Sequence, residues 1–430
     1  MASWYYNNLR GRLGFGLSRE LWIVQSGVFL NTLGWGAVLP FEVIYLHDSR
    51  GFSLRLAGLV VGTLTGVAVA AAPAAGPFID RFGARVVAAW AGAALAAGYF
   101  GLAFAGSPIV AFAAAAVGGA GNGALVPAQS TLLAALAPSE LRHRATAVSR
   151  VSTNAGFGLG GALGGVVAGY GANGLVALFV VNAATYLAYV AVLVTVVRGA
   201  EPVEPSAGGY RIVLRDRAFV HLALANVAII GIGWGVLPWV VPPYAKHSMG
   251  IGPELIGLLM LANAATVVVA QVPVAKLAEG RRRVKMMASG AWIFAAACLA
   301  ILLAQALGAA AYSTLVLASI AIGLGECFHS AALMPLVADL APASLRGRYM
   351  AATGLSWWAG LALAPTLGTQ LLSVSAAAAF VGCAAIAGCA GVSMLRLERR
   401  LSPPCRSTPR PRLTSQNAEA YAFPAAMGDE

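Results

Sequence analysis

Charged residues are scarce in this 430-residue sequence: only 10% of its positions are Asp, Glu, Lys or Arg, whereas 59% are hydrophobic. A soluble protein of this length could not bury so much apolar surface, so the sequence excludes an ordinary water-soluble globular protein. Cysteine is also rare, and the five cysteines show no metal-ligand spacing. We therefore expect neither a disulfide framework nor a metal site, and we expect the cysteines to pack as small apolar side chains.

The sequence also lacks the residue patterns of catalysis. It contains no recognisable nucleophile–base constellation, no metal-binding cluster and no phosphate-binding loop. We therefore do not expect an enzyme, and we expect no cofactor.

Long apolar runs are what the sequence has in quantity. They are about 20 to 27 residues long, which at 1.5 Å per residue is enough to cross a hydrocarbon core of roughly 30 Å. Backbone groups in lipid must be hydrogen-bonded within their own segment, so these runs predict α-helices. We predict twelve membrane-spanning helices, near residues 21–46, 56–77, 86–106, 109–136, 145–168, 175–197, 218–245, 255–275, 286–308, 312–338, 350–371 and 376–395.

The net charge of +12 is distributed unevenly along the chain. Of the 28 lysines and arginines, 25 fall in the N-terminal segment, the even-numbered connections or the C-terminal tail, and only Arg50, Arg55 and Lys246 fall in the odd-numbered connections. The positive-inside rule therefore predicts that both termini are cytoplasmic, and the charge indicates topology rather than nucleic-acid binding. The first run is too long for a signal-peptide core, so we interpret it as an uncleaved span. The low lysine content is typical of a GC-rich bacterial genome, so we expect a multi-pass protein of the bacterial inner (plasma) membrane.

The sequence repeats itself about 200 residues apart. Residues 34–59 carry Gly-Trp-Gly, Val-Leu-Pro, Tyr and Gly-Leu in an order that returns in residues 233–258, and residues 137–144 return as 341–348. A long duplication in so apolar a chain is typical of a transporter built from two similar halves with the substrate site between them.

The duplication sets the expected organisation. We predict an N-terminal six-helix half (1–197), a cytoplasmic linker (198–217), a C-terminal six-helix half (218–395) and a disordered cytoplasmic tail (396–430). Six spans is an even number, so both halves enter the membrane in the same orientation and relate by an axis along the membrane normal.

The connection after the second predicted span carries a recognisable motif, formed by Gly76, Asp80, Arg81, Gly83 and Arg85. It resembles the G-x-x-x-D-R-x-G-x-[RK] signature of the major facilitator superfamily. Together with the duplication, the resemblance covers about residues 20–395 and implies that family's fold of twelve helices in two pseudo-symmetric halves. It also implies that this loop latches the two halves on the cytoplasmic side during alternating access.

The residues of the motif suit a latch. Gly76 and Gly83 permit a tight turn and close helix approach, and the carboxylate of Asp80 can accept from helix N-terminal N–H groups and pair with an arginine. The repeated segment, near residues 274–283, keeps positive charge but has lost the Asp-Arg pair. We therefore expect a one-sided latch.

The signatures of proton antiporters in that superfamily are only partly present. In the predicted fifth span Gly156, Gly160 and Gly164 stand in place, but Gly161 occupies the proline position, and no arginine precedes the glycine-rich stretch of the fourth span. Small residues at this spacing are also explained by close helix packing, which we take as their default role.

Glu326 lies near the midpoint of the tenth predicted span, where a charge is costly. Its repeat partner is Asn122, and His329 lies one turn further on the same helix face. A carboxyl group held away from water can exchange a proton, so we expect proton coupling or substrate binding at Glu326, and we count His329 and Asn122 among the candidate residues for that role. A buried structural hydrogen bond is the alternative.

A second candidate face lies on the first span. Asn31 and Glu42 are about three turns apart and Tyr45 lies near the same stripe, so we expect this face to look into the cavity, although Glu42 could also be a gate or rim residue. The repeat mates Trp35 and Trp234 could line a pocket for an amphipathic substrate or pack between the halves.

These features together predict secondary active transport, with proton-coupled export of small amphipathic or cationic molecules by a drug-efflux antiporter as the preferred function. Two alternatives stay open: a proton-coupled importer or uniporter of a nutrient or metabolite, and a non-transporting membrane sensor or chaperone on the same fold. The expected partners are a small-molecule substrate, protons and the lipid bilayer, and we expect a monomer.

Overall fold

The computed structural model describes residues 16–137, 141–197, 212–342 and 345–401, and they are almost entirely helical. Twelve helices in this part of the chain have 17 residues or more, which confirms the predicted all-α membrane fold. They are α2 (Arg19–Val38), α4 (Leu54–Phe82), α5 (Ala84–Ala103), α6 (Pro108–Leu136), α7 (Arg142–Ala168), α8 (Gly171–Val196), α9 (Arg217–Gly233), α12 (Pro253–Ala278), α13 (Arg283–Ala304), α14 (Ala311–Leu340), α15 (Arg346–Val374) and α16 (Ala376–Leu397).

Length and hydropathy identify nine candidate membrane spans among the described residues, one of which joins α13 and α14 into a single segment of 58 residues. Helices α7 and α15 do not meet the hydropathy criterion, although they have 27 and 29 residues. Both run along the contact between the two halves, where a helix faces protein on more than one side and needs less apolar surface than a lipid-facing helix.

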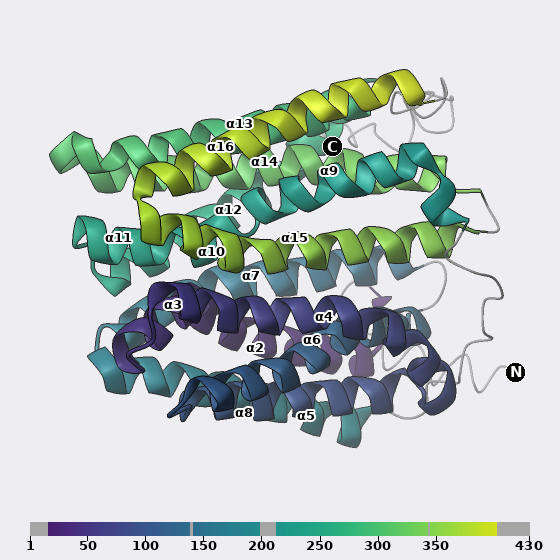
Figure 1. The fold of residues 1–430 in the computed structure, drawn as a ribbon. Helices are drawn as coiled ribbons and strands as arrows, with labels where there is room; N and C mark the ends of the chain where they lie inside the picture. Colours follow the sequence, from purple (N-terminus) through teal and green to yellow (C-terminus); the bar gives the residue numbers. More distant parts are fainter. Residues whose placement is uncertain (1–15, 138–140, 198–211, 343–344, 402–430) are drawn as a thin grey trace, which may run out of the picture.

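The helices form two bodies that lie side by side with their long axes roughly parallel (Figure 1). Helices α2 to α8, coloured purple to blue, form the first half, and α9 to α16, coloured teal to yellow, form the second. The seam between the halves is made by α4 against α15 and by α7 against α12. Most of the predicted linker (198–211) and tail (402–430) lies outside the described residues, whereas residues 398–400 form the short helix η8 (Glu398–Arg400) after α16.

The first and seventh spans are broken, although the sequence predicted continuous helices over 21–46 and 218–245. After α2 the chain forms η2 (Leu39–Phe41), α3 (Glu42–Ile44) and η3 (Tyr45–Ser49), and after α9 it forms α10 (Val236–Trp239) and α11 (Val241–Met249). Each break falls at the repeated Val-Leu-Pro segment. Proline removes an N–H donor and clashes with the preceding turn, so Pro40 and Pro238 interrupt the regular helix.

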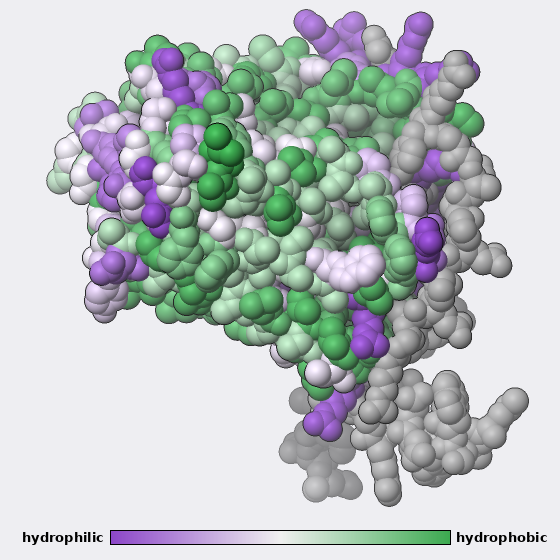
Figure 2. Space-filling view, turned by 60° about the horizontal axis from the view of Figure 1, so that its bottom comes forward, coloured by the Kyte–Doolittle hydropathy of each residue, from purple (hydrophilic) through white to green (hydrophobic). Residues whose placement is uncertain are grey.

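Hydrophilic side chains gather toward the two ends of the molecule and apolar ones cover the middle, as a bilayer requires (Figure 2). We call the end where α4 meets α5 and α12 meets α13 the basic end, because Arg81, Arg85 and Arg281–Arg283 lie there. The other end, which carries η3 and α11, is called the rim end.

The halves are packed most tightly toward the rim end. A Cβ built on Gly62 near the start of α4 would lie 1.9 Å from Oγ1 of Thr366, and one built on Gly165 near the end of α7 would lie 2.6 Å from the backbone oxygen of Pro253. Only glycine allows helices to approach so closely. The structure is therefore closed at the rim end.

Candidate functional site

A cavity of about 260 Å³ lies within the first half, between α2, α6, α7 and α8. Its wall runs along α2 from Leu21, near the basic end, to Trp35, near the middle of the molecule. Among the described residues that line it, none is an Asp, Glu, Lys, Arg or His. The polar members of the lining are Gln25, Asn31, Thr32, Asn122, Gln129, Ser130, Ser149, Thr153, Tyr186 and Tyr189.

Two amide side chains of the cavity wall have unused hydrogen-bonding capacity. Oε1 of Gln25 and Nδ2 of Asn31 are buried and have no hydrogen-bond partner among the described residues, and each residue is only 3% exposed. A buried donor or acceptor without a partner costs free energy, so an acceptor and a donor left open beside a cavity favour a molecule that supplies the complementary groups. The wall can therefore bind a molecule with both polar and apolar parts.

Glu326 lies near the middle of α14, as predicted, and is 9% exposed. Nδ2 of Asn263 in α12 donates to its Oε1 over 2.9 Å. Among the described residues no Lys, Arg or His side chain lies within ion-pair distance of this carboxyl group. An ionised carboxylate in such a place would be poorly compensated, which suits a group that is neutral for part of a cycle.

His329, on the same helix, belongs to a different network. Its Nε2 lies 2.9 Å from Oδ1 of Asn226 in α9, and Nδ2 of Asn226 donates to Oγ of Ser356 in α15 over 2.7 Å. Its Nδ1 is buried and has no hydrogen-bond partner in the described part of the chain. The carbonyl oxygen of Asn226 can only accept, so Nε2 carries the proton and Nδ1 presents a lone pair. Glu326 and His329 are thus held by separate neighbours.

The predicted cavity aromatics, Trp35 and Trp234, occupy different environments. Trp35 lines the cavity and packs on Phe157, with ring centroids 4.6 Å apart. Trp234 packs inside the second half, with its ring centroid 4.8 Å from that of Trp357 and 5.5 Å from that of His329. The repeat mates therefore differ: the first faces the cavity and the second supports the histidine.

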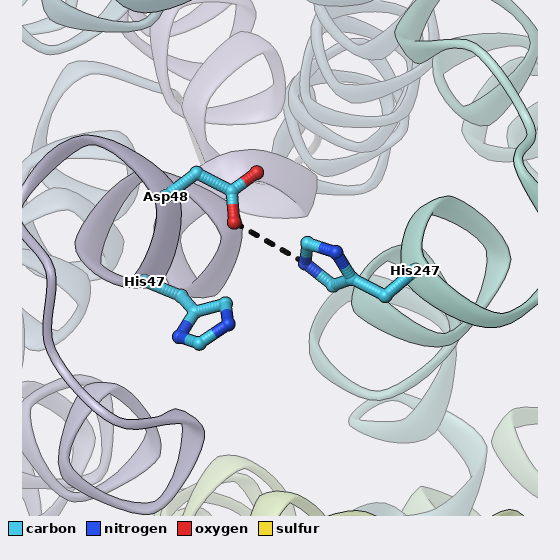
Figure 3. Close-up of side chains that lie close together, drawn as sticks. All are labelled: His47, Asp48 and His247. Atoms are coloured by element: carbon cyan, nitrogen blue, oxygen red, sulfur yellow. Dashed lines mark ion pairs between the residues drawn. The ribbon is translucent and has the colours of Figure 1, made fainter.

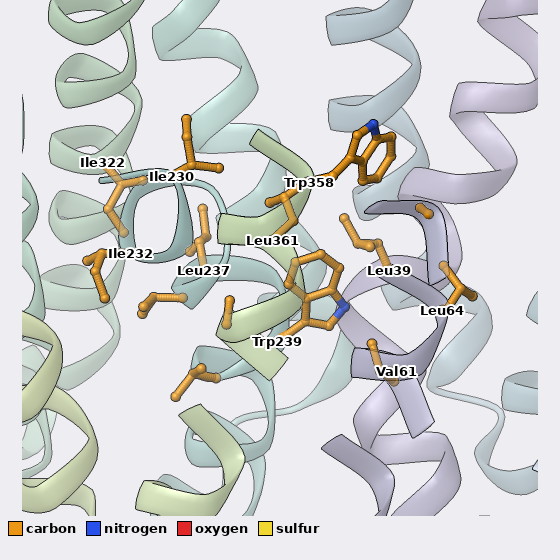
Figure 4. Close-up of a cluster of buried hydrophobic side chains, with 14 of the residues drawn as sticks. Leu39, Val61, Leu64, Ile230, Ile232, Leu237, Trp239, Ile322, Trp358 and Leu361 are labelled. Carbon is orange, nitrogen blue, oxygen red and sulfur yellow. The ribbon is translucent and has the colours of Figure 1, made fainter. Parts of the chain in front are cut away.

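Glu42 does not line the cavity but joins the two halves. Its Oε1 accepts from the hydroxyl of Tyr99 in α5 over 3.0 Å, and its Oε2 accepts from Nε1 of Trp239 in α10 over 2.9 Å. The residue is 3% exposed. Figure 4 shows Trp239 among apolar side chains of both halves, with its indole nitrogen turned toward the first half. The placement favours a gate residue.

Tyr45 also lies away from the cavity. Its hydroxyl donates to the backbone oxygen of Ala103 over 2.5 Å, and its ring packs on Phe179. The single face predicted for Asn31, Glu42 and Tyr45 is therefore divided, because the helix is interrupted between Asn31 and Glu42 and the continuous-helix spacing no longer applies.

Polar contacts join the halves at the rim end. Nζ of Lys246 in α11 lies 2.6 Å from Oδ2 of Asp48 in η3, and Nε of Arg55 donates to Oγ of Ser373 over 2.8 Å. Nε2 of His247 lies 3.3 Å from Oδ1 of the same aspartate. Partial burial lowers the pKa of His247, while the charge of Asp48 acts in the opposite direction.

The predicted latch is not engaged in this conformation. Gly83 has a φ of 82°, the tight turn that the sequence predicted, but helix α5 has no side-chain cap and Asp80 makes no hydrogen bond or ion pair with any described residue. Arg81 lies over the ring of Phe82, and Arg85 donates to the backbone oxygens of Leu193 and Val194. In this conformation Asp80 therefore makes neither of the contacts expected of it with the described residues, and its role in a latch stays a prediction.

The second half pairs its own arginines at the basic end. Arg283 forms an ion pair of 2.6 Å with Asp339 at the end of α14, and Arg282 pairs with Glu398 after α16. Both pairs lie within that half, so they hold its helices to one another and not the two halves together.

The glycines of α7 pack against two different helices, α2 of the first half and α12 of the second. Gly156, Gly160 and Gly164 face α2, where a Cβ on Gly160 would lie 2.2 Å from the backbone oxygen of Leu33. The position occupied by Gly161 faces the second half, where a Cβ would lie 2.6 Å from Cβ of Met260. The helix-packing interpretation agrees with these contacts.

Sequence reasoning missed several of these residues, among them Asn263, Asn226, Tyr99 and Trp239. Asn263 and Asn226 are uncharged amides inside long apolar runs, so they lack the formal charge that made Glu326 conspicuous in the sequence. Trp239 directly follows the repeated Val-Leu-Pro segment, but the continuous helix assumed there gave no reason to place it against Glu42.

Comparison with known proteins gives a consistent result. The family model of the Major Facilitator Superfamily matches residues 26–232 and 223–424. The uncharacterized MFS-type transporter YttB of Bacillus subtilis (strain 168) is 27% identical over 368 residues, which is 83% of this chain and 89% of that protein. The uncharacterized MFS-type transporter YqjV of the same organism is 24% identical over 267 residues, 60% of this chain and 64% of that protein.

Solved structures share the fold at low sequence identity. A POT family transporter in complex with 5-aminolevulinic acid matches with a TM-score of 0.75 at 13% identity, covering 92% of this chain and 99% of that one. The peptide transporter POT in complex with sulfate matches with a TM-score of 0.73 at 17% identity, covering 92% and 97%. The nucleoside transporter NupG matches with a TM-score of 0.71 at 13% identity, covering 88% and 100%.

Proposed function

This chain belongs to the major facilitator superfamily, and from that premise we propose that it exports small amphipathic or cationic molecules in exchange for protons, by alternating access through rocking of two six-helix halves. The observation that carries the proposal is Glu326, a carboxyl group near the middle of a membrane-spanning helix with a single amide donor and no described cation beside it. A proton is the smallest ion that can neutralise such a group.

The lining of the cavity supports the proposed substrate class. Binding of an anionic substrate commonly uses Arg or Lys side chains, and the described lining contains neither. Trp35 supplies an aromatic surface, while Gln25 and Asn31 supply an acceptor and a donor. This combination fits a neutral or cationic molecule with an apolar body.

The proposed direction depends on orientation. The cavity lies toward the basic end and the rim end is closed. The positive-inside rule places the basic end in the cytoplasm, so this conformation loads from the cytoplasm. Proton entry from outside to Glu326 would then accompany release of the substrate to the outside.

Orientation can be tested by cysteine labelling. A single cysteine at Asp48 should react with a membrane-impermeant maleimide applied to intact cells, and a single cysteine at Arg81 should react only after the cells are opened. The native cysteines would first be replaced, since Cys389 is exposed on the molecular surface. External labelling at position 81 with protection at position 48 would show the opposite orientation and would reverse the proposed direction.

Glu42 is proposed to hold the rim end closed. Opening that end must separate Trp239 from Glu42, and a hydrogen bond to a charged group contributes about 1.5–3 kcal/mol. We therefore expect Trp239→Phe to shift the balance of conformations toward a rim-open state by roughly tenfold to a hundredfold. Spin-label distances between the two halves at the rim end would measure the shift.

Tyr99→Phe is the matched control for that experiment. It also removes one donor to Glu42, but Tyr99 and Glu42 belong to the same half, so their contact need not break when the halves separate. We expect it to lower stability with little change in the balance of conformations. Equal shifts in both variants would show that Glu42 does not act as a gate between the halves.

The proposed transport can be tested in sealed proteoliposomes by substrate-driven proton movement. Ethidium serves as the amphipathic cation, and a dipeptide and a nucleoside serve as competitors of other classes. Opposite movement of ethidium and protons is the expected result. Proton movement in the same direction as the dipeptide or nucleoside, with no response to ethidium, would contradict the export proposal and favour a proton-coupled importer.

A further inference from the structure

Three metal-ligating side chains meet across the seam at the rim end: His47 and Asp48 from η3 and His247 from α11 (Figure 3). One potential ligand atom from each lies within 4.8 Å of those of the other two. The centroids of the two imidazole rings lie 5.3 Å apart, with the rings edge to face. Nε2 of His247 is 3.3 Å from Oδ1 of Asp48. These groups are outside the cavity and outside the networks of Glu326 and Glu42.

The duplication explains why these residues meet. His47 and Asp48 stand in the first half where Lys246 and His247 stand in the second, 199 residues later, at the same distance after the repeated tyrosines. Halves related by an axis along the membrane normal bring equivalent loops together at that axis. The pair His47–Asp48 of the first half therefore faces the pair Lys246–His247 of the second half where the two halves join.

His47 is already oriented as a metal ligand would be. Its Nδ1 lies 2.7 Å from the backbone oxygen of Phe52. A carbonyl oxygen can only accept, so Nδ1 donates and the lone pair of Nε2 is left available. In metal sites the second ring nitrogen of a ligating histidine commonly donates to a carbonyl or carboxylate in this way, which fixes the ring and its tautomer.

The ligand set selects the class of ion. Two imidazoles and one carboxylate suit Zn²⁺ or a similar divalent transition metal, with water in the fourth position. Ligand atoms arranged tetrahedrally around zinc at about 2.0–2.2 Å lie about 3.3–3.6 Å apart, so a spread of 4.8 Å needs only side-chain adjustment. The side chains of Asp48 and His247 are 24% and 38% exposed, which leaves a path for the ion.

Lys246 is the competitor at this site. Its ammonium lies 2.6 Å from Oδ2 of Asp48 and puts a positive charge close to the place where the metal would bind. Oδ1 of the same carboxylate faces His247, so the metal and the lysine approach different oxygens. Removing the lysine charge should therefore strengthen metal binding.

We propose that His47, Asp48 and His247 form a binding site for Zn²⁺ or a related divalent transition metal, which joins the two halves at the rim end and holds that end closed. Metal binding itself is independent of the proposed transport. Its consequence, slower transport when zinc is present on the rim side, rests on the proposed function.

Binding is measured on the full chain in lipid nanodiscs by zinc titration calorimetry, with the absorption spectrum of Co²⁺ as a second readout of the ligand set. We expect one Zn²⁺ per chain. His47→Ala and His247→Ala should each weaken binding at least about tenfold, and Lys246→Met should tighten it by roughly tenfold. His221→Ala is the matched histidine control, since His221 lies in α9 beside Ser393 at the other end of the molecule, and binding should be unchanged.

Each outcome decides one part of the proposal. Absence of zinc binding in the Lys246→Met protein, or equal binding in wild type and a His47→Ala/His247→Ala double variant, would overturn the site. Zinc binding that depends on the two histidines but leaves spin-label distances at the rim end unchanged would overturn the closing role and leave the site in place. Both measurements need no transported substrate, so their failure is distinguishable from failure of the export proposal.

Discussion

Replacing Glu326 with Gln is expected to abolish uphill transport and its dependence on pH, while binding of a neutral substrate survives. The substitution removes the titrating group but keeps an oxygen that can accept from Asn263, whose Nδ2 lies 2.9 Å from Oε1 of Glu326. It also makes the position resemble its repeat mate, Asn122, in charge. We expect accumulation to fall to equilibration in proteoliposomes with an imposed proton gradient.

A structural role for Glu326 predicts a different result. If the carboxyl only stabilised α14 against α12, Glu326→Gln would lower the unfolding temperature and leave coupling intact in the folded protein. The control is Glu279→Gln, which removes an exposed carboxylate after α12 and should alter neither property. A Glu326→Gln protein that still pumps uphill with the wild-type pH profile would exclude Glu326 as the coupling residue and direct attention to Glu42.

Replacing Asp80 with Asn is expected to slow turnover by roughly tenfold to a hundredfold without destabilising the conformation described here. In that conformation Asp80 has no hydrogen-bond or ion-pair partner among the described residues, so the substitution removes no contact that the structure describes. The proposed latch forms only when the basic end closes, and there the variant loses a charge-assisted contact. Turnover in proteoliposomes and thermal unfolding of the same preparation would be measured together.

The control for the latch is Asp339→Asn. This variant also removes an acid at the basic end, but the acid pairs with Arg283 inside the second half, over 2.6 Å. We expect a loss of stability with a much smaller effect on turnover. If Asp80→Asn transported at the wild-type rate, or if Asp339→Asn slowed transport as strongly, Asp80 would not be the latch.

Much of the fold follows from composition and periodicity. A chain with long apolar runs and a duplicated pattern has few ways to satisfy its backbone in lipid, so twelve helices in two bodies could be predicted. The breaks in the first and seventh spans could not be predicted in the same way. The repeated prolines indicate that a helix is interrupted, but they do not specify the conformation of the residues around the interruption. Pro40 lies inside a three-residue 3-10 helix, whereas Pro238 lies inside a four-residue α-helix.

The site could be predicted only in part. Glu326 is conspicuous in sequence because a carboxyl group in an apolar run is expensive, and it lies where its position in the span indicated. Its donor Asn263 is 63 residues away, and Trp239, the partner of Glu42, is 197 residues away. Such pairs depend on how helices from distant parts of the sequence are packed, which hydrophobic spacing alone does not specify.

The metal site shows the same limit. His47, Asp48 and His247 have no ligand spacing in the sequence, and the cysteine pattern gave no reason to expect a metal. Only the meeting of equivalent loops at the rim end brings the three side chains together.

Cross-linking the rim end tests alternating access most directly. Cysteines at Asp48 and Lys246, which face each other across the seam with side-chain atoms 2.6 Å apart, would be joined by a short reducible bis-methanethiosulfonate reagent in a protein without native cysteines. Rocking of the halves predicts that cross-linking stops transport and that reduction restores it, while either single cysteine treated with the reagent remains active. Transport by the cross-linked protein at the rate of the untreated double variant would contradict alternating access by rocking of the two halves.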